Sequence, residues 1–508
     1  MAAAPLIGID IGTQQIKIAE LRPGKTGLTV SALALGPTPL GVIQNGIITD
    51  PAAMGSAIKQ LMRESGITVK RAVGSIAGQN AVVIRIIEVP RMTDAELKET
   101  MKWEVERHVP FAPSETQIDY QPLTPRTPEA ASGPNMEVLL AVAQQDAVAN
   151  YLDVMFAAGL DPVAVDIEPL AIARAILDLS DGQVVVRPQT LPGEIDYSSP
   201  PAETVAVVNI GAANTEIAIF QGDQLAFPRS LPLAGDSLTR AIAESLQYTV
   251  DQAERVKRDY GMVQLDRMAV YTGTAYDTEG GYEAPEFGDD QQFNLSDDAA
   301  DNPFDLNANL DGDFGSAFRS APSGRLDGGG ADDMTRTQPM ARRTLNLARP
   351  AASDVPPAFM PPPDDGFGLP PISGGGMDEN RLRDDVFEAI APVLQELSAE
   401  IRRSLDYYRS RGAQVSVDRV LLSGGSAGLT NLAAFLQNEL QTPVSVANAL
   451  NGLAVTSKHF DPSYLATIAP AFTIAVGLAA RDVVFGANPM PKKPKPVKAP
   501  KAAASSAS

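Results

Sequence analysis

The sequence predicts an α/β fold with layers around mixed sheets, and three observations support this prediction. Strand-like and helix-like segments alternate along the 508 residues, which is typical of α/β layers around mixed sheets. A strand, turn and strand pattern occurs twice, at Gly8 to Leu21 and at Val207 to Phe220. A further strand, at Val417 to Leu422, runs directly into a Gly-Gly turn. A chain of this length holds roughly two to four globular units.

Residues 1–84 are predicted to hold strands and one helix. Apolar strands at Leu6 to Ile11 and Ile16 to Leu21 flank a turn that opens with glycine. Asp50 to Ser65 predicts a helix, because an Asp cap precedes apolar residues on one helical face. Arg71 to Glu88 then returns to the strand pattern. This order is the one expected for a helix packed on a sheet.

A capped helix is predicted at Thr93 to His108. Thr93 and Glu96 have the spacing of a capping box, and the apolar residues that follow lie along one stripe. His108 ends the helix, where an imidazole favours the negative end of the helix dipole. Trp103, the only tryptophan of the chain, is expected to be buried by packing. Neither side chain is expected to be catalytic.

The rest of the folded chain continues the alternation of strand and helix patterns. A Pro-rich loop, at about Val185 to Glu203, interrupts its middle. Long helices are predicted at about 234–260 and 378–409.

Two segments, 276–380 and 488–508, are predicted to be disordered. The first carries 20 Asp and Glu against six Arg and no Lys, and it is rich in Gly and Pro. Such a segment cannot bury enough apolar surface to offset its ordering entropy. It also carries most of the chain's formal net charge of −21. The second segment is a basic tail of Lys, Pro, Ala and Ser without an apolar face, so we expect no direct membrane insertion.

The composition excludes several classes of function. With no Cys and two His, the chain has no disulfides, thiolate zinc sites or His-rich metal centres. The negative net charge is the wrong sign for gripping nucleic-acid phosphates, so no nucleic-acid partner is expected. No basic region precedes the first apolar residues, which argues against a secretory signal. The apolar stretch Ala469 to Ala480 is shorter than the roughly 20 residues that cross a bilayer, and we predict a buried helix there.

The two similar hairpins predict a phosphate clamp. Aligning Ile11-Gly12 with Ile210-Gly211 also pairs Asp10 with Asn209. A Gly-opened turn with short polar side chains can supply the converging N–H groups that nucleotide phosphates need. Asp10 could hold Mg²⁺ through water, and Lys17 is placed to neutralise phosphate charge. The alternative is that each segment is an ordinary hairpin of a buried sheet.

The Gly-Gly turn, Ser423 to Ser426, opens a helix predicted to start near Leu429. Backbone without side chains lets a flat base approach, so Gly424 and Gly425 would lie against adenine. The alternative is a strand-to-helix turn that needs glycine for steric reasons alone. Neither a GxxxxGK[ST] loop nor a GxGxxG turn before a helix is present at the hairpins, which argues against other phosphate-binding folds.

Taken in order, hairpin, hairpin and strand-Gly-Gly-helix resemble the actin-like ATPase superfamily. That resemblance implies a two-lobed fold with duplicated ribonuclease-H-like domains. The segments EVPRMTDAELKETMKWEVERHVPF, VDIEPLAIARA and AGDSLTRAIAESLQYTVDQAERVKRDYG are similar to the PilM family of type IV pilus assembly, which belongs to the FtsA-like subfamily. On this resemblance, residues 1–84 begin the first lobe, and residues 85–166 are the subdomain called 1C in FtsA-like proteins. Residues 167–206, with the Pro-rich loop, return to the first lobe. Residues 207–275 open the second lobe, and residues 381–487 complete it and end in a closing helix of the first lobe. ATP and Mg²⁺ would bind between the lobes.

The resemblance also implies the residues of the nucleotide site. Those expected to contact phosphates, metal, ribose or base are Asp10, Gly12, Thr13, Gln14, Lys17, Asn209, Gly211, Ala212, Ala213, Asn214, Thr215, Glu254, Lys257, Gly424, Gly425 and Ser426. Glu254 and Lys257 would lie on the ribose side, unless they form an ordinary solvated helix pair.

Two acidic positions bear on hydrolysis. The superfamily generally has aspartate where this chain has Asn209, which puts hydrolysis in doubt more than binding. Glu168 is the carboxylate proposed to orient the attacking water, although a buried structural acid is the alternative. We therefore expect slow ATP hydrolysis at most.

The resemblance implies a cytoplasmic adaptor of type IV pilus assembly. It would bind the amino-terminal cytoplasmic peptide of the inner-membrane protein PilN and contact other pilus assembly proteins. Its place would be the inner face of the cytoplasmic membrane, reached through these partners, and self-association is left open. Two alternatives are an FtsA-like cell-division filament protein and a sugar or small-molecule kinase of the same superfamily, for which no catalytic aspartate in a sugar-kinase setting is seen.

Overall fold

Two sheets with the same internal arrangement form the framework of the chain. The computed structural model describes residues 4–24, 28–123, 133–179, 203–272, 379–410, 416–456 and 460–484, all of which belong to one compact unit. The disordered segments predicted at 276–380, apart from its last two residues, and at 488–508 lie outside the described residues, as does most of the Pro-rich loop.

The first sheet has six strands around the hairpin of β1 and β2. β1 pairs with β2 in antiparallel fashion and with β6 in parallel. In spatial order the strands are β10 (Asp161–Ile167), β6 (Arg71–Ile76), β1 (Leu6–Ile11), β2 (Gln15–Pro23), β3 (Leu28–Pro37) and β16 (Ala454–Val455).

The second sheet repeats this arrangement with five strands. β11 pairs with β12 in antiparallel fashion and with β14 in parallel, as β1 does with β2 and β6. In spatial order the strands are β13 (Gln224–Leu231), β12 (Thr215–Gln221), β11 (Thr204–Ile210), β14 (Arg419–Ser423) and β15 (Val444–Val446). The predicted duplication is confirmed, because the five shared strands have the same order and direction in both sheets.

Helices cover both faces of the first sheet. α1 (Pro51–Glu64) starts at the predicted Asp50 cap and packs with α4 (Gln145–Ala157) over one cluster of buried residues. α12 (Thr473–Ala479) lies against β1 on the other side, next to α5 (Glu168–Ala173). Gly8 permits this approach, because a Cβ there would stand 2.0 Å from the carbonyl oxygen of Ala475. The segment 469–480 is buried and helical, as predicted.

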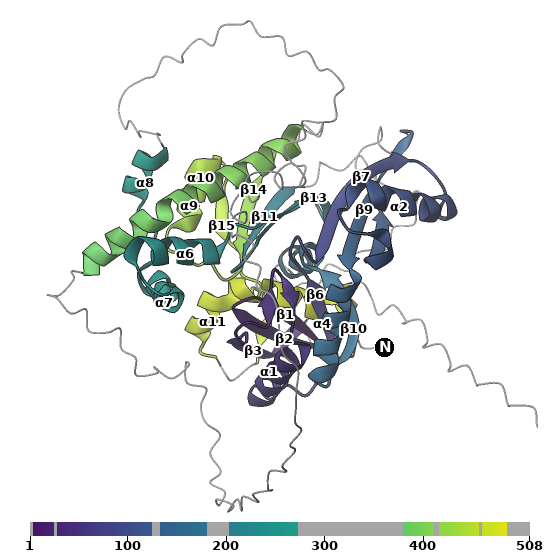
Figure 1. Cartoon of the computed structure of the whole chain (residues 1–508), viewed down its shortest axis with the longest axis horizontal. Helices are drawn as coiled ribbons and strands as arrows, with labels where there is room; N and C mark the ends of the chain where they lie inside the picture. Colours follow the sequence, from purple (N-terminus) through teal and green to yellow (C-terminus); the bar gives the residue numbers. More distant parts are fainter. Residues whose placement is uncertain are drawn as a thin grey trace, which may run out of the picture. The chain divides into compact units, whose positions relative to one another are not determined.

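The second sheet is covered by a group of helices that includes α9 (Glu379–Tyr408), which runs beside α6 (Gly235–Leu246) and α10 (Leu432–Leu440) (Figure 1). The single helix predicted at 234–260 is wrong: α6 (Gly235–Leu246) ends at Gln247, which adopts a left-handed conformation with φ 55°. α7 (Val250–Tyr260) then starts with its own cap, in which the Thr249 side chain accepts from the backbone N–H of Gln252. α8 (Leu265–Thr272) follows.

A third, three-stranded sheet carries the helix with the capping box. Its strands are β7 (Val82–Pro90), β9 (Asn135–Gln144) and β8 (Thr116–Pro122), and α2 (Asp94–His108) packs on it (Figure 1). The capping box of Thr93 and Glu96 is confirmed. The expected burial of Trp103 is wrong, because its side chain is 69% exposed.

The predicted boundaries 85–166 of this subdomain also differ from the structure. β10 pairs with β6 in the first sheet, and α4 packs against α1. The inserted subdomain therefore ends near Gln144, and it begins with β7 at Val82. The short elements β4 (Ile43–Gln44), β5 (Ile47–Ile48), α11 (Pro462–Ile468) and α13 (Arg481–Val484), with short 3₁₀ and π turns, complete the part described. No helix within these described ranges is long and apolar enough to cross a membrane.

Candidate functional site

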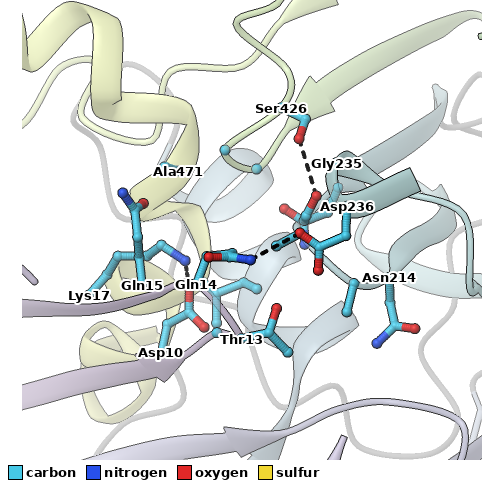
Figure 2. Close-up of a pocket in the computed structure, with 18 of the residues that line it drawn as sticks. Asp10, Thr13, Gln14, Gln15, Lys17, Asn214, Gly235, Asp236, Ser426 and Ala471 are labelled. Atoms are coloured by element: carbon cyan, nitrogen blue, oxygen red, sulfur yellow. Dashed lines mark hydrogen bonds and ion pairs between the residues drawn. The ribbon is translucent and has the colours of Figure 1, made fainter. Parts of the chain in front are cut away.

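The two hairpin turns and the Gly-Gly turn meet at one cleft of about 530 Å³. Figure 2 shows Asp10, Gln14 and Lys17 of the first hairpin near Asn214 and Asp236 of the second lobe. The predicted residues that line the cleft are Asp10, Gly12, Thr13, Gln14, Lys17, Glu168, Asn209, Gly211, Ala212, Ala213, Asn214, Glu254, Lys257, Gly424, Gly425 and Ser426. Residues 199 positions apart in the paired hairpins are thus brought to one site.

The two turns close in the same way. The N–H of Gly12 donates to the carbonyl of Gln15 at 3.0 Å, and the N–H of Gly211 donates to that of Asn214 at 3.0 Å. Thr215 departs from the prediction, because its buried hydroxyl donates to the carbonyl of Leu233 at 2.6 Å and its side chain does not line the cleft. Thr215 therefore braces the second turn.

Charge at the first turn is balanced within the hairpin. Asp10 and Lys17 face each other across the strand register, and Lys17 Nζ lies 3.1 Å from Asp10 Oδ2. The hydroxyl of Thr38 donates to the carbonyl of Gly12 at 2.6 Å and ties the turn to the end of β3. The hydroxyl of Thr13 is buried and has no hydrogen-bond partner. An unsatisfied buried hydroxyl costs about 1–3 kcal/mol, so a ligand with an oxygen at this position would remove a penalty.

The two positions of the Gly-Gly turn differ in whether they could accommodate a side chain. Gly424 has φ 91°, and a Cβ there would lie 2.4 Å from the carbonyl oxygen of Ile210. A Cβ at Gly425 would meet nothing within 4 Å. The steric alternative therefore holds for Gly424, whereas Gly425 leaves open space beside the backbone. α10 starts at Leu432, three residues later than predicted.

Glu254 and Lys257 form part of a network inside the cleft wall. Their ion pair measures 2.6 Å, and the Thr239 hydroxyl donates to Glu254 at 2.6 Å while it accepts from Lys257 at 2.7 Å. Burial by itself would raise the pKa of Glu254, but the charge of Lys257 and the hydrogen bonds from Lys257 and Thr239 hold that pKa below its usual value. Both side chains are mostly buried, so the solvated-pair alternative does not describe them.

Glu168 opens α5 and faces two spaces. It lines the cleft, and it also lines a cavity of about 50 Å³ together with Glu216 of β12 and Ser230 of β13. Burial raises the pKa of Glu168 well above its usual value, and the charges of Glu216 and Asp10 add to this while Lys17 opposes it. Burial raises the pKa of Glu216 to about 7, against the effect of a hydrogen bond from the Ser230 hydroxyl. Two carboxyls from different lobes therefore meet beneath the cleft.

Sequence reasoning missed Glu216 and Asp236. A charge inside the apolar strand TEIAIF was a usable signal for Glu216, since an unpaired buried acid needs an explanation. Asp236 carried no such signal. Its Oδ1 accepts from the Gln14 side chain at 3.2 Å across the cleft (Figure 2), and its N–H donates to the carbonyl of Ala212 at 2.8 Å.

The arrangement suits a polyphosphate with a flat group attached. Two backbone turns, an orphaned hydroxyl and the ammonium groups of Lys17 and Lys257 lie on one cleft, and Gly425 leaves space at another part of its lining. No cluster of three or more His, Cys, Asp or Glu that could hold a metal occurs among the residues described. Asp10, which lines the cleft, is the carboxylate that could hold a Mg²⁺ ion through water.

Two family models match the chain. The model described as type IV pilus assembly protein PilM matches residues 8–267, half of the chain, and that of cell division protein FtsA matches residues 206–469. The first match contains both hairpins and the inserted subdomain. The second contains the Gly-Gly turn and most of the second sheet.

Among curated relatives, cell division protein FtsA of Streptococcus pneumoniae serotype 2 (strain D39 / NCTC 7466) is 24% identical over 277 residues, 50% of this chain and 55% of that protein. FtsA of Bacillus subtilis (strain 168) is 24% identical over 281 residues, 51% of this chain and 59% of that protein. The chain thus spans less than two thirds of the length of these relatives.

Among solved structures, a chain of the PilM-PilN type IV pilus biogenesis complex has 26% sequence identity and a TM-score of 0.60. The match covers 94% of this chain and 98% of that chain, so the likeness extends over both lobes and the inserted subdomain.

Proposed function

This chain belongs to the PilM family of type IV pilus assembly proteins and has the predicted actin-like fold, and from this premise we propose that it is an ATP-binding adaptor of type IV pilus assembly. The observation that carries the proposal is that two turns closed by the same hydrogen bond meet at one cleft. The first of these turns also holds the buried Thr13 hydroxyl, which has no hydrogen-bond partner. Paired turns of this kind suit the β and γ phosphates of a nucleotide.

Each part of the cleft has a role in this proposal. Lys17 neutralises phosphate charge, and Asp10 holds Mg²⁺ through water when the nucleotide is bound. Bound Mg²⁺ would offset the negative charge of the phosphates. Glu254 and Lys257 contact the ribose side, and Gly425 lies beside the base.

Two residues near the expected γ phosphate, Asn209 and Glu168, indicate that the chain hydrolyses ATP slowly at most. Asn209 is neutral, and its side-chain oxygen already accepts from the Ser423 hydroxyl at 3.1 Å. Burial raises the pKa of Glu168 well above its usual value, which disfavours the ionised carboxylate that a general base needs. We propose that ATP acts mainly as a bound ligand that holds the lobes together.

The proposed partner is the amino-terminal cytoplasmic peptide of a PilN-like inner-membrane protein. The similar solved chain comes from a PilM-PilN complex, which supports a partner of this kind. We propose that the inserted subdomain takes part in binding this peptide, and that the chain reaches the inner face of the cytoplasmic membrane through it and other pilus proteins.

Titration calorimetry with MgATP tests the nucleotide part of the proposal. Asp10→Ala should lower the affinity at least tenfold, because the metal loses its water-mediated anchor, while Asp153→Ala on the exposed face of α4 should bind as the unmodified chain does. Equal affinities for all three proteins would contradict the site.

A pull-down with a synthetic PilN amino-terminal peptide tests the partner. Binding is expected to be stronger with MgATP than without it. Absence of binding in both conditions, by a chain that binds ATP, would count against the adaptor role and leave nucleotide binding in place.

The FtsA match over residues 206–469 favours one second candidate, an FtsA-like filament protein. ATP-dependent polymers that sediment with lipid vesicles at high salt would support it over the adaptor.

A further inference from the structure

One face of α11 and the turn that follows it forms part of the cleft wall. Tyr464, Thr467, Ile468 and Ala471 line the cleft at the spacing of a single helical face. The N–H of Gly424 donates to the carbonyl of Pro470 at 2.9 Å. This hydrogen bond holds the end of the α11 segment beside the Gly-Gly turn, although the two belong to different lobes.

Tyr464 stands out among the side chains of this wall. The aromatic residues that line the cleft, within the described part of the chain, are Tyr151 and Tyr464. Tyr151 is buried, and its hydroxyl donates to the carbonyl of Ile9 at 3.1 Å, so its ring is part of the core. Tyr464 is 47% exposed. A ligand in the cleft can therefore reach the ring of Tyr464.

The ring of Tyr464 is held in place from behind. It stacks on Phe460 with 6.0 Å between ring centroids and an interplanar angle of 24°. Phe460 in turn packs against the buried cluster under the first sheet. The start of α11 is fixed as well, because the Asp461 side chain accepts from the backbone N–H of Ser463 at 2.9 Å. A ring braced in this way loses little conformational freedom when a ligand binds.

The rest of this region has open space beside two glycines and apolar side chains next to them. Gly425 and Gly428 also line the cleft, and a Cβ at either would meet nothing within 4 Å. Leu429 and Ile468 add apolar surface. A charged polyphosphate gains nothing by packing on an apolar surface, whereas a planar aromatic base does.

We propose that Tyr464 stacks on the base of the bound nucleotide and gives the cleft a preference for purines. This inference rests on the proposed nucleotide binding and adds the residue that selects the base. Stacking of a base on an aromatic side chain changes affinity by roughly 5- to 150-fold. The larger ring system of a purine gains more than a pyrimidine does.

Titration calorimetry with MgATP, MgCTP and magnesium tripolyphosphate tests the proposal on the full chain. Tyr464→Ala should weaken ATP binding by roughly 5- to 150-fold, bring ATP close to CTP and leave tripolyphosphate binding unchanged. Tyr464→Phe should bind ATP as the unmodified chain does, because the ring is kept. Phe156→Ala, which removes a ring 60% exposed on α4 and outside the cleft, serves as the matched control.

Tyr464→Leu keeps an apolar side chain against Phe460, so it serves as a second variant if Tyr464→Ala does not fold. It should show the same selective loss for ATP. Unchanged ATP affinity in Tyr464→Ala and Tyr464→Leu overturns the stacking role and leaves the proposed function standing. An equal loss for ATP and tripolyphosphate also overturns it. If the unmodified chain binds neither ligand, both the inference and the proposed function fail.

Discussion

At the scale of single residues, the buried carboxyls of Glu168 and Glu216 control how stability depends on pH. Both pKa values are raised, so the folded state binds these protons more tightly than the unfolded state does. The contribution of Glu216 to stability is complete below the usual glutamate pKa of 4.5 and is lost as pH rises through its raised pKa of about 7; the contribution of Glu168 is lost in the same direction. Asp10, Lys17 and Ser230 face this pair and act on the same protons.

We therefore predict that Glu216→Gln flattens the pH dependence. The amide keeps a hydrogen-bond acceptor for Ser230 and cannot ionise. Between pH 5 and pH 8 the unmodified chain should lose on the order of 3 kcal/mol more of its free energy of unfolding than the variant does. Denaturant unfolding at both pH values measures this. Parallel losses in the two proteins would contradict the raised pKa of Glu216.

The two glycines at 424 and 425 give a second prediction at this scale. Gly424→Ala should lower the free energy of unfolding by about 1–3 kcal/mol or more, because it strains a positive φ and strikes the Ile210 carbonyl. Gly425→Ala should stay within about 0.5 kcal/mol of the unmodified chain, because the added methyl meets nothing. Thermal unfolding distinguishes them. Equal effects would mean that the turn does not have this geometry.

The same pair shows the limit of prediction from sequence. The Gly-Gly sequence is consistent with two roles: a turn that cannot accommodate a side chain, and a turn that leaves space for a base. The difference between the two positions depends on how close the β11 backbone lies, which is set by the packing of strands more than 200 residues apart in sequence.

At the scale of elements, the alternation of apolar residues and the helix-capping residues predicted strands and helix starts correctly where neighbouring residues alone decide the structure. Alternation of apolar residues placed β1 and β2, and Thr93 with Glu96 placed the start of α2. The break between α6 and α7 was missed because Gln247 is not a residue that favours a left-handed conformation. The Thr249 and Gln252 cap was the local signal that could have revealed it.

Trp103 was wrongly expected to be buried because tryptophan is apolar and the chain has one. The helix decides otherwise: Leu97, Met101 and Val105 point into the core, and a residue two positions from Met101 and Val105 lies on the opposite face. We predict that acrylamide quenches Trp103 fluorescence nearly as well as that of free tryptophan, and that Trp103→Ala changes the free energy of unfolding by less than about 0.5 kcal/mol. A shielded indole would refute this exposure.

At the scale of the whole molecule, the duplicated sheets bring distant turns to one cleft. Hydrogen bonds from Gln14 to Asp236 and from Gln79 to the carbonyl of Ser230, at 3.2 and 2.7 Å, join the lobes across or beside it. The duplication and the cleft-lining residues of the two turns, apart from Thr215, could be predicted because the two hairpins share a sequence pattern. The subdomain boundaries could not, because β10 is assigned to the first sheet by its pairing with β6.

The measurement that tests the central claim most directly is MgATP titration of Thr13→Val beside Thr204→Val. Both threonines carry a buried hydroxyl without a hydrogen-bond partner. Thr13 lines the cleft, whereas Thr204 begins β11, at the end of that strand opposite the turn that lines the cleft. Each variant should be at least as stable as the unmodified chain, since a penalty of about 1–3 kcal/mol is removed. We predict that Thr13→Val loses about tenfold in ATP affinity, the effect of one hydrogen bond to a charged oxygen, while Thr204→Val loses none. Equal affinities in the two variants would contradict a phosphate at the first turn.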